Sequence, residues 1–319
     1  MRVAVTGGNG FIGAQALRHL VDDGHDVLCF DIREPSPIAT EVEHGVTFVQ
    51  GDVTDPAQVY DTFAAFDPDG VIDFASLLGR ASQRNPRRAV SVNLQGSLTV
   101  LQAATSLDID RVVTAASVAV YGPSDGRTLT EETPRTPDSV YGMTKYALEE
   151  LGAVYQRQGV EFAALEPVHG LGPDRRRGNV EDAFVCKAAV SGTPLTVPDT
   201  GQPIEIIDVV EEARSFVDAV LAEELSHDRY IVGTGNRATL AEIAGLVRDR
   251  VPEADITVTD ERGDDHLEPL PPSDTGRIEQ DLGWTARSSV EETVETYLGW
   301  LQDNPKQWSF DPADVPWEN

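Results

Sequence analysis

A glycine-rich turn near the amino terminus constrains the fold of this chain more than any other feature. Residues 6–13 read TGGNGFIG, between an apolar run that predicts a β-strand and a segment with helical spacing. We interpret Gly7 as permitting the tight turn, Gly10 as admitting a pyrophosphate close to the backbone, and Gly13 as letting the helix pack on the sheet. Because a helix N-terminus presents free N–H groups, the turn predicts a dinucleotide-binding site.

Apolar runs alternate with helical patterns over the first two thirds of the chain. This alternation predicts an α/β protein with a doubly wound parallel sheet of Rossmann type. Past residue 170 the pattern is mixed and predicts a smaller α/β domain. We expect strands at 2–6, 27–31, 46–51, 71–75, 111–117, 160–166, 195–197 and 229–232, and helices at 11–23, 89–106, 140–157, 209–222, 239–250 and 288–301.

The expected organisation is a dinucleotide-binding domain, a mainly substrate-binding domain and an irregular, proline-containing tail. These parts cover residues 1–166, 167–303 and 304–319, with later segments returning to the first domain.

An acidic residue at the end of the second strand indicates which dinucleotide binds. The carboxylate of Asp31 would accept hydrogen bonds from the ribose hydroxyls and repel a 2′-phosphate, which favours NAD over NADP. Arg33 lies close by and would soften that preference. Further expected cofactor contacts are Asn9, Phe11, Ile12, Asp52, Val53, Ala75, Lys145 and Pro167. Asp52 and Val53 would flank the adenine ring, and a helix cap or turn is the alternative role for Asp52.

Tyr141 and Lys145 are four residues apart and therefore share one face of the expected helix. A nearby ammonium and an oxidised nicotinamide would lower the pKa of the phenol. The phenolate would then take a proton from a substrate hydroxyl while hydride leaves to the nicotinamide. Ser117, at the end of the fifth strand, would hydrogen-bond the same substrate oxygen.

Together these motifs resemble the extended short-chain dehydrogenase/reductases of the NAD-dependent epimerase/dehydratase group. The resemblance reaches to about residue 303, and its segments are TGGNGFIG at 6–13, GDVTD at 51–55, VNLQGSLTVLQAA at 92–104, ASVAVYG at 116–122, YGMTK at 141–145, GTPLTV at 192–197, YIVGTGNRATL at 230–240 and a run from 262 to 284. It implies a Rossmann domain, a smaller C-terminal substrate domain, a helix-bundle homodimer and Ser117, Tyr141 and Lys145 as the catalytic set. Asn93 matches an asparagine for which packing and catalysis are both open.

The chain departs from the family pattern at three places. Ala115-Ala116-Ser117 stands where dehydratases carry Thr-Asp-Glu, so the acid and base for eliminating water are missing. His169 replaces an asparagine that holds the substrate in nucleotide-sugar enzymes. Ile204 stands where an arginine grips a diphosphate, and an apolar side chain makes no such contact.

Three hypotheses for function remain open. The first is an NAD-dependent epimerase of a nucleotide-linked or other anionic sugar. The second is an NAD-dependent dehydrogenase of a free sugar, sugar acid or small hydroxy compound. The third is a catalytically silent NAD-binding protein. No metal site is predicted.

Arginines gather in two short segments that the family pattern does not explain. They lie at Arg80 to Arg88 and at Arg175, Arg176 and Arg177, and Arg262 is a further candidate. They either form surface ion pairs or recognise the carboxylate or phosphate of a substrate.

Composition limits the partners and the setting of the protein. The 54 acidic residues exceed the 25 Lys and Arg, for a net charge of −29, which argues against binding nucleic acid or an anionic membrane. With only three lysines, the chain is typical of a salt-rich cytoplasm, and an ordinary acidic enzyme is the alternative. Two cysteines form no disulfide framework. With no leader and no apolar run of about 20 residues, a soluble cytoplasmic protein is expected.

Overall fold

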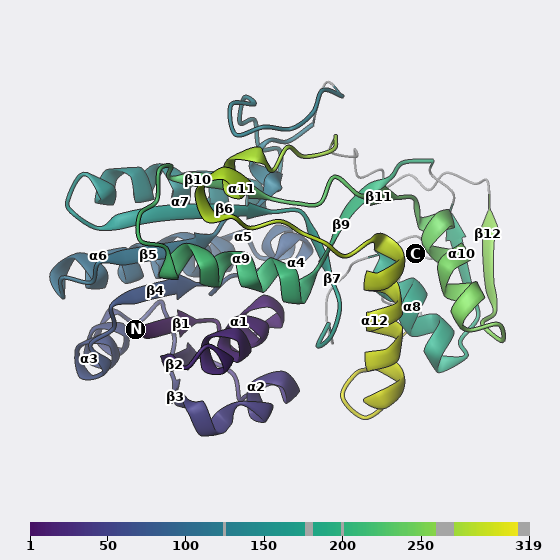
Figure 1. Ribbon diagram of the computed structural model, residues 1–319, viewed down its shortest axis with the longest axis horizontal. Helices are drawn as coiled ribbons and strands as arrows, with labels where there is room; N and C mark the ends of the chain where they lie inside the picture. The colour runs from purple at the N-terminus through teal and green to yellow at the C-terminus, as the bar shows by residue number, and fades with distance from the viewer. Residues whose placement is uncertain (124–125, 176–180, 199–200, 260–270, 312–319) are drawn as a thin grey trace.

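A seven-stranded parallel sheet forms the centre of the molecule (Figure 1). The computed structural model describes residues 1–123, 126–175, 181–198, 201–259 and 271–311. The strand order is β10-β6-β5-β4-β1-β2-β3, so the winding reverses between β1 and β4, as in a Rossmann fold. The strands are β1 (Arg2–Thr6), β2 (Asp26–Asp31), β3 (Val46–Gln50), β4 (Gly70–Asp73), β5 (Arg111–Ala115), β6 (Glu161–Pro167) and β10 (Arg229–Val232). The predicted fold class is confirmed.

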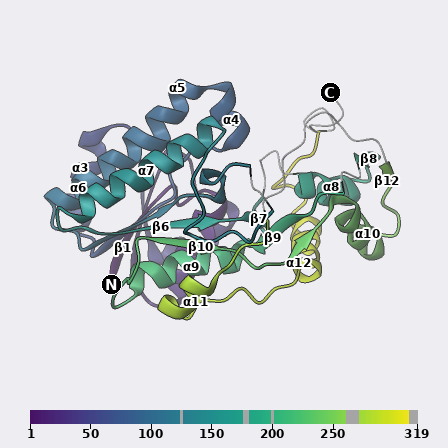
Figure 2. The same cartoon turned by 90° about the horizontal axis from the view of Figure 1, so that it is seen from above.

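Helices cover both faces of this sheet, as Figure 2 shows. One face packs on α1 (Phe11–Asp22), α2 (Pro37–Glu41), α9 (Val209–Leu221) and α11 (Gly276–Leu282), and the other packs on α3 (Pro56–Phe66), α6 (Ser97–Ser106) and α7 (Val140–Gln156). The first core includes Leu17 and Phe216, and the second includes Phe63 and Phe162. The strands contribute apolar side chains to both cores, because helices bury both faces of a parallel sheet.

The helix predicted over 89–106 is present, but it begins earlier and contains a π-helical stretch. It runs without a break through α5 (Pro86–Ala89), the π-helical segment η2 (Val90–Gly96) and α6, and the short helix α4 (Gly79–Arg84) precedes it. Gly96 ends η2, and a Cβ there would lie 2.6 Å from Cγ2 of Val53. The π-helical stretch, whose turns are wider than those of an α-helix, therefore lies where the helix passes close to the loop after β3.

The C-terminal part builds two small sheets with their own helices and core. One sheet has the order β11-β9-β7 and the other pairs β12 with β8. Their bounds are β7 (His169–Leu171), β8 (Leu195–Pro198), β9 (Ile204–Asp208), β11 (Arg237–Ala238) and β12 (Ile256–Thr259), and the helices are α8 (Glu181–Ser191), α10 (Leu240–Arg250) and α12 (Val290–Asp303). Tyr297 and Leu301 of α12 are fully buried in this core.

Two segments of the C-terminal half return to the large sheet. β10 adds a parallel strand beside β6, and α9 packs along α1 (Figure 1). The tail from 304 to 311 contains no helix or strand, and the indole of Trp308 donates a hydrogen bond to the carbonyl oxygen of Leu301 at 2.8 Å. In the described part of the chain, no helix is both long and apolar enough to cross a bilayer.

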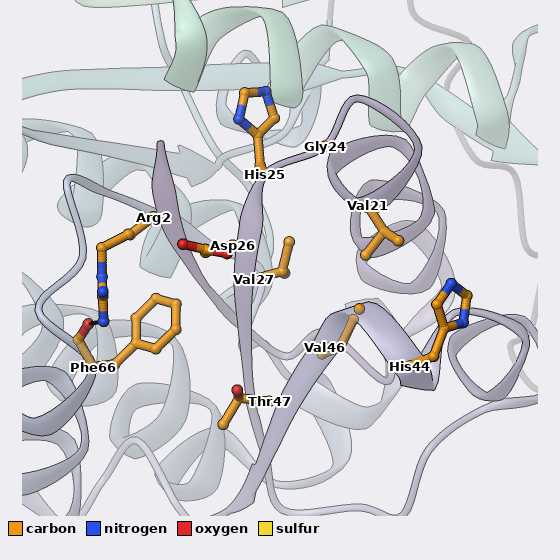
Figure 3. A pocket seen from close by; sticks show the side chains of 11 residues that line it. Arg2, Val21, Gly24, His25, Asp26, Val27, His44, Val46, Thr47 and Phe66 are labelled. Carbon is orange, nitrogen blue, oxygen red and sulfur yellow. Dashed lines mark hydrogen bonds between the residues drawn. The ribbon is translucent and has the colours of Figure 1, made fainter.

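A pocket of about 460 Å³ opens at the amino ends of β1, β2 and β3 (Figure 3). Arg2, His25, Asp26, His44 and Phe66 lie around it. This edge of the sheet is opposite the carboxyl ends of the strands, where doubly wound folds bind their ligands. None of the residues predicted to be functional lines it.

Candidate functional site

The glycine turn between β1 and α1 has the shape of a phosphate cradle. Gly7 has a φ of +66°, and a Cβ there would lie 2.8 Å from the backbone nitrogen of Ala75. A Cβ on Gly13 would lie 2.5 Å from the carbonyl oxygen of Gly7. Gly10 caps α1 without a side-chain hydrogen bond. The turn therefore leaves room beside uncapped N–H groups, which fits the pyrophosphate of a dinucleotide.

Asp31 is buried at the end of β2, beside this turn. One of its carboxylate oxygens accepts a hydrogen bond from the backbone nitrogen of Asn9, and the other from that of Arg33, each at 2.9 Å. A carboxylate has further lone pairs for the hydroxyls of a ribose. The guanidinium Nε of Arg33 lies 3.8 Å from the same carboxylate. The amide of Asn9 donates to the carbonyl oxygen of Arg33 at 2.7 Å, so its side chain braces the turn.

The other residues expected at the cofactor lie along the carboxyl edge of the sheet. Asp52 accepts hydrogen bonds from the backbone nitrogen and hydroxyl of Thr54 at 2.9 and 2.8 Å, and its second oxygen lies 3.2 Å from Nη2 of Arg88. It therefore stabilises a turn, and its contact with an adenine ring stays a prediction. Val53 is buried, and its contact with an adenine ring stays a prediction. Phe11 and Ile12 form the first turn of α1, Ala75 follows β4, and Pro167 ends β6.

Helix α7 positions the predicted reactive pair. It begins after Ser139, whose hydroxyl accepts a hydrogen bond from the backbone nitrogen of Gly142 at 3.1 Å. The phenol of Tyr141 shares a hydrogen bond with Ser117. Ser117 is the second residue after the end of β5. Nζ of Lys145 lies 5.6 Å from the ring centroid of Tyr141. The structure thus brings Ser117, Tyr141 and Lys145 together.

Burial moves the pKa values of Tyr141 and Lys145 in opposite directions. Burial raises the pKa of Tyr141 to about 12, while the hydrogen bond from Ser117 lowers it and the charge of Glu212 raises it. Burial lowers the pKa of Lys145 to about 8, and the carboxylates of Asp73 and Glu149 oppose this shift. A positive charge near the phenol, such as an oxidised nicotinamide, would be needed to bring the tyrosine toward neutral pH.

Asn93 links three segments around this site. Its side-chain oxygen accepts from the backbone nitrogen of Leu77 at 2.7 Å, and its amide donates to the carbonyl of Leu77 at 3.0 Å and to the hydroxyl of Thr144 at 3.1 Å. Because Thr144 precedes Lys145, the fully buried Asn93 holds α7 against the loop after β4. Its contacts are structural, and a role toward substrate stays a prediction.

The predicted substrate residues occupy different environments. The guanidinium carbon of Arg175 lies 4.5 Å from the ring centroid of Phe11, and its Nη1 donates to the carbonyl of Gly170 at 2.6 Å. This places Arg175 beside the first turn of α1. Arg80 lies on α4, partly buried, and His169 begins β7, where it pairs with Ile206 of β9. Arg176, Arg177 and Arg262 lie outside the described residues.

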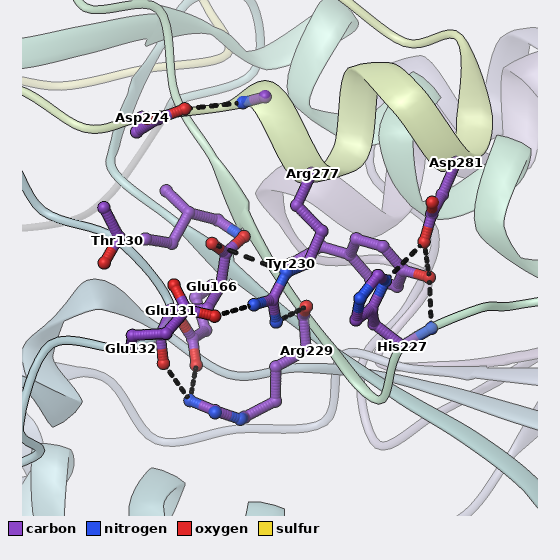
Figure 4. A network of polar contacts seen from close by, with 12 residues as sticks. Thr130, Glu131, Glu132, Glu166, His227, Arg229, Tyr230, Asp274, Arg277 and Asp281 are labelled. Carbon is purple, nitrogen blue, oxygen red and sulfur yellow. Dashed lines mark hydrogen bonds and ion pairs between the residues drawn. The ribbon is translucent and has the colours of Figure 1, made fainter.

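Buried carboxyl groups near the site that were not anticipated from the sequence include Glu149, Glu166 and Glu212. Glu166 accepts a hydrogen bond from the phenol of Tyr121 at 2.5 Å and lies 3.9 Å from Arg229, within the polar network of Figure 4. Burial raises the pKa of Glu149 to about 7, and burial together with the charge of Glu149 raises that of Glu166. The spacing of four residues, which puts Glu149 on the same helix face as Lys145, is a sequence signal that could have pointed to it.

The chain matches the model of the NAD dependent epimerase/dehydratase family over residues 3–233. It belongs to this family. The resemblance drawn from the motifs is therefore confirmed, as is an NAD-dependent enzyme of the extended short-chain dehydrogenase/reductase type. NAD is the cofactor, and the cradle at Gly7 to Gly13 with the carboxylate of Asp31 fits it.

Three relatives match the chain almost end to end. The low-salt glycan biosynthesis protein Agl12 of Haloferax volcanii is 29% identical, over 94% of this chain and 99% of its own length. The UDP-glucose 4-epimerase of Lactobacillus helveticus is also 29% identical, over 96% and 98%. The crystal structure of the Thermus thermophilus UDP-glucose 4-epimerase with NAD has a TM-score of 0.84 and 26% identity, over 95% and 99%.

Proposed function

We propose that this protein is an NAD-dependent epimerase of a nucleotide-linked or other anionic sugar. The observation that carries the proposal is the meeting of Ser117, Tyr141 and Lys145 at the carboxyl edge of the sheet that also carries the glycine turn. The names of relatives support it, because two of the three described above are UDP-glucose 4-epimerases.

The residues of this chain supply the proton chemistry of such a reaction. NAD, when bound, supplies a reversible two-electron oxidation of a carbinol to a ketone. Tyr141 takes the hydroxyl proton and later returns it, and Ser117 holds the same oxygen. The ammonium of Lys145 favours the phenolate form of Tyr141. Inversion follows when the ketone is turned within the site before reduction, so that hydrogen returns to its opposite face.

The positions that eliminate water in dehydratases carry no acid or base here. Ala115 and Ala116 are buried at the end of β5, where the family's dehydratases carry threonine and aspartate. Methyl groups transfer no protons, so the site retains the oxidation step without the elimination step. We therefore do not propose a dehydratase.

A dehydrogenase of a free sugar, sugar acid or small hydroxy compound is the second candidate. Ile204 at the start of β9 and His169 at the start of β7 favour it, because neither reproduces the diphosphate and substrate contacts that nucleotide-sugar enzymes carry at these positions.

One experiment separates the candidates. The purified protein is incubated with NAD and UDP-glucose, UDP-galactose, or a panel of free sugars and sugar acids. Absorbance at 340 nm and the stereochemistry of the product are both followed. Epimerised nucleotide sugar without net NADH supports the epimerase, and NADH in proportion to product supports the dehydrogenase. Tight NAD binding without turnover of any substrate points to the catalytically silent protein.

We propose that Arg80, Asn93, His169 and Arg175 contribute to the substrate side of the site, together with Arg176, Arg177 and Arg262. Arg175 supports this for an anionic ligand, because its guanidinium stands beside the uncapped first turn of α1. Arg175→Ala is expected to weaken binding of an anionic ligand roughly tenfold. Measuring the KM of the sugar substrate and the Kd of NAD separately shows which anion it serves.

A homodimer through helices is proposed as the assembly. Met143 and Val154 of α7 and Val90 of η2 are large apolar side chains with 50%, 38% and 41% of their surface exposed. An interface over α7 would cover them. Sedimentation velocity of the wild type and of a Met143→Lys variant tests this assembly, and a monomeric wild type overturns it.

The acidic surface is proposed to be an adaptation to a salt-rich cytoplasm. A net charge of −29 destabilises a compact chain by self-repulsion, and molar salt screens it. The match with a Haloferax protein supports this reading. A thermal melt titrated with KCl is expected to show Tm rising toward molar salt, whereas an equal Tm at low and molar salt overturns it.

A further inference from the structure

Two buried carboxyl groups meet behind the reactive helix, one from α7 and one from the end of β6. The side chain of Glu149 is 1% exposed, and Glu166 is fully buried. Oε1 of each residue is buried and receives no hydrogen bond from a donor in the described part of the chain. The two side chains are hydrogen-bonded to each other.

A hydrogen bond between two carboxyl groups requires a proton, because an ionised carboxylate only accepts. The other oxygen of each group already has a donor. Oε2 of Glu149 accepts from Nη1 of Arg135 at 2.7 Å, and Oε2 of Glu166 accepts from the phenol of Tyr121 at 2.5 Å. The two Oε1 atoms are therefore the pair between which a proton fits, and one proton satisfies both of them.

Two carboxylates that touch in a buried place do not both ionise near neutral pH. Burial raises the pKa of Glu149 to about 7, and burial together with the charge of Glu149 raises that of Glu166 well above its usual value. Arginines oppose both shifts: Arg135 bonds to Glu149, and Nη1 of Arg229 lies 3.9 Å from Oε1 of Glu166 (Figure 4). The other titratable groups that face the pair are Tyr121, Glu131 and Lys145.

The pair connects the two segments that carry the reactive residues. Tyr121 lies four residues after Ser117, with one turn of 3₁₀ helix between them. Glu149 lies on α7 one turn after Lys145. The hydrogen bonds that run from Tyr121 through Glu166 to Glu149 therefore join the Ser117 segment to the reactive helix across the end of β6.

We propose that Glu149 and Glu166 share one proton, and that this proton positions the reactive residues by holding α7 against the segment that carries Ser117. The inference rests on the proposed function only in taking Ser117, Tyr141 and Lys145 as the reactive set. When the pair loses its last proton in alkaline solution, two carboxylates face each other without a donor between them. Their repulsion then loosens α7 from the end of β6. Both glutamates act through the segments they join and are positioning residues.

The first measurement follows the proton itself and needs no turnover. Glutamate labelled with ¹³C at the carboxyl group is incorporated into the full chain, which is studied with NAD present. The signals of Glu149 and Glu166 are identified by their loss in Glu149→Gln and Glu166→Gln. In Glu166→Gln an amide donates permanently to Glu149 and the neighbouring charge is gone. The titration midpoint of Glu149 is therefore expected to fall by at least about 1 pH unit.

Glu131→Gln is the matched control for this titration. Glu131 is a buried carboxyl group of the same network, but it pairs with Arg277 at 3.7 Å. Its replacement is expected to leave the midpoint of Glu149 within about 0.3 pH unit of the wild type. A midpoint in Glu166→Gln that moves no more than in this control overturns the shared proton. Should Glu166→Gln not fold, Glu149→Gln gives the same comparison with Glu166 as the titrating group.

Hydrogen exchange followed by mass spectrometry tests the positioning role. In the wild type, protection of peptides from α7 is corrected for the intrinsic effect of pH on exchange. This protection is expected to fall at least about tenfold over the pH range in which the pair loses its last proton. Glu166→Gln keeps a permanent donor and is expected to stay protected. Protection that changes equally in the wild type and Glu166→Gln overturns the positioning role.

Kinetics with the substrate found for the wild type give a second readout of positioning. Glu166→Leu removes the shared proton and is expected to lower kcat by at least about tenfold with KM within about threefold, and Glu166→Gln is expected to recover most of the loss. A folded Glu166→Leu with the kcat of the wild type contradicts the proposal. If the wild type turns over no sugar while the titration and exchange results are as expected, the proposed function falls and the shared proton stands. If the wild type epimerises a sugar and Glu166→Gln moves neither result, only the role of the pair falls.

Discussion

Lys145 donates a hydrogen bond from its ammonium to the carbonyl oxygen of Ala115, 2.6 Å away. The bond joins the middle of α7 to the last residue of β5, and so fixes the reactive helix on the strand that leads to Ser117. It also holds the ammonium in a buried place, 5.6 Å from the ring centroid of Tyr141.

Replacing Lys145 by methionine is expected to shift the pH dependence of turnover to the alkaline side. Without the ammonium, the pKa of Tyr141 rises further, and the ascending limb of kcat/KM against pH moves up by about 1 unit or more. Lys145→Arg keeps a positive charge and is expected to restore part of the activity at neutral pH. A pH profile of Lys145→Met that coincides with the wild type in position contradicts the role given to this charge.

Replacing Tyr141 by phenylalanine is expected to reduce kcat by at least ~10²-fold, because the acid/base group is removed. Binding of NAD and the Tm are expected to change little. Tyr146→Phe is the matched control, since Tyr146 lies on the same helix and its ring packs under the guanidinium of Arg135. Turnover is measured with the substrate found for the wild type, and a Tyr141→Phe enzyme as active as Tyr146→Phe refutes the mechanism.

Asp31 is expected to make the protein bind NAD at least about tenfold more tightly than NADP at low salt, because its buried carboxylate opposes the 2′-phosphate. Asp31→Asn should narrow the difference between the affinities for NAD and NADP, and so should molar salt. Arg33→Ala removes the cation beside Asp31 and should widen this difference in affinity. Calorimetric Kd values for the two dinucleotides provide the measurement, and equal affinities in the wild type remove this role from Asp31.

The buried pair Glu149 and Glu166 is expected to make the protein less stable as the pH rises through the acidic range. The pKa of Glu149 is about 7 in the folded protein against 4.5 as its ordinary value, so between these values the unfolded chain loses a proton that the folded chain keeps. The free energy of unfolding therefore falls by up to about 1.4 kcal/mol per pH unit from this group.

Glu149→Gln should remove this loss, so its stability relative to the wild type grows from pH 4.5 to pH 7 and is constant above. Glu150→Gln is the control, because Glu150 shares Arg135 as a partner but is 53% exposed. Urea unfolding at several pH values gives the comparison. Parallel curves for Glu149→Gln and the wild type would show that the carboxyl group titrates normally.

Local patterns predicted the elements that carry the cofactor and the reactive pair. The strands at Arg2–Thr6 and Arg229–Val232 agree residue for residue, and α7 begins at the predicted Val140 because Ser139 caps it. Each of these signals lies within a few residues of what it predicts. A short apolar run, a glycine turn or a capping serine needs no knowledge of distant neighbours.

Features that depend on distant pairing were not predictable in this way. The π-helical segment η2 ends at Gly96, where Val53 from the loop after β3 lies close to the helix. The sheet β11-β9-β7 joins segments from three separate regions of the chain. Glu212 shows the same limit at the site. In the sequence it reads as an ordinary acid in the first turn of a helix, and only the space at Gly170 shows that it is buried.

The return of β10 to the edge of the sheet means that the small C-terminal part is built from chain on both sides of that strand, with α8 before it and α10 and α12 after it. Residues between β6 and β10 leave the sheet and come back to it, and α9 within that stretch covers α1. A fragment that ended at β6 would leave that strand as an open edge and would uncover the apolar side of α1, both of which invite aggregation. The whole excursion from β6 to β10 is therefore tied to the folding of the half of the chain that carries the glycine turn.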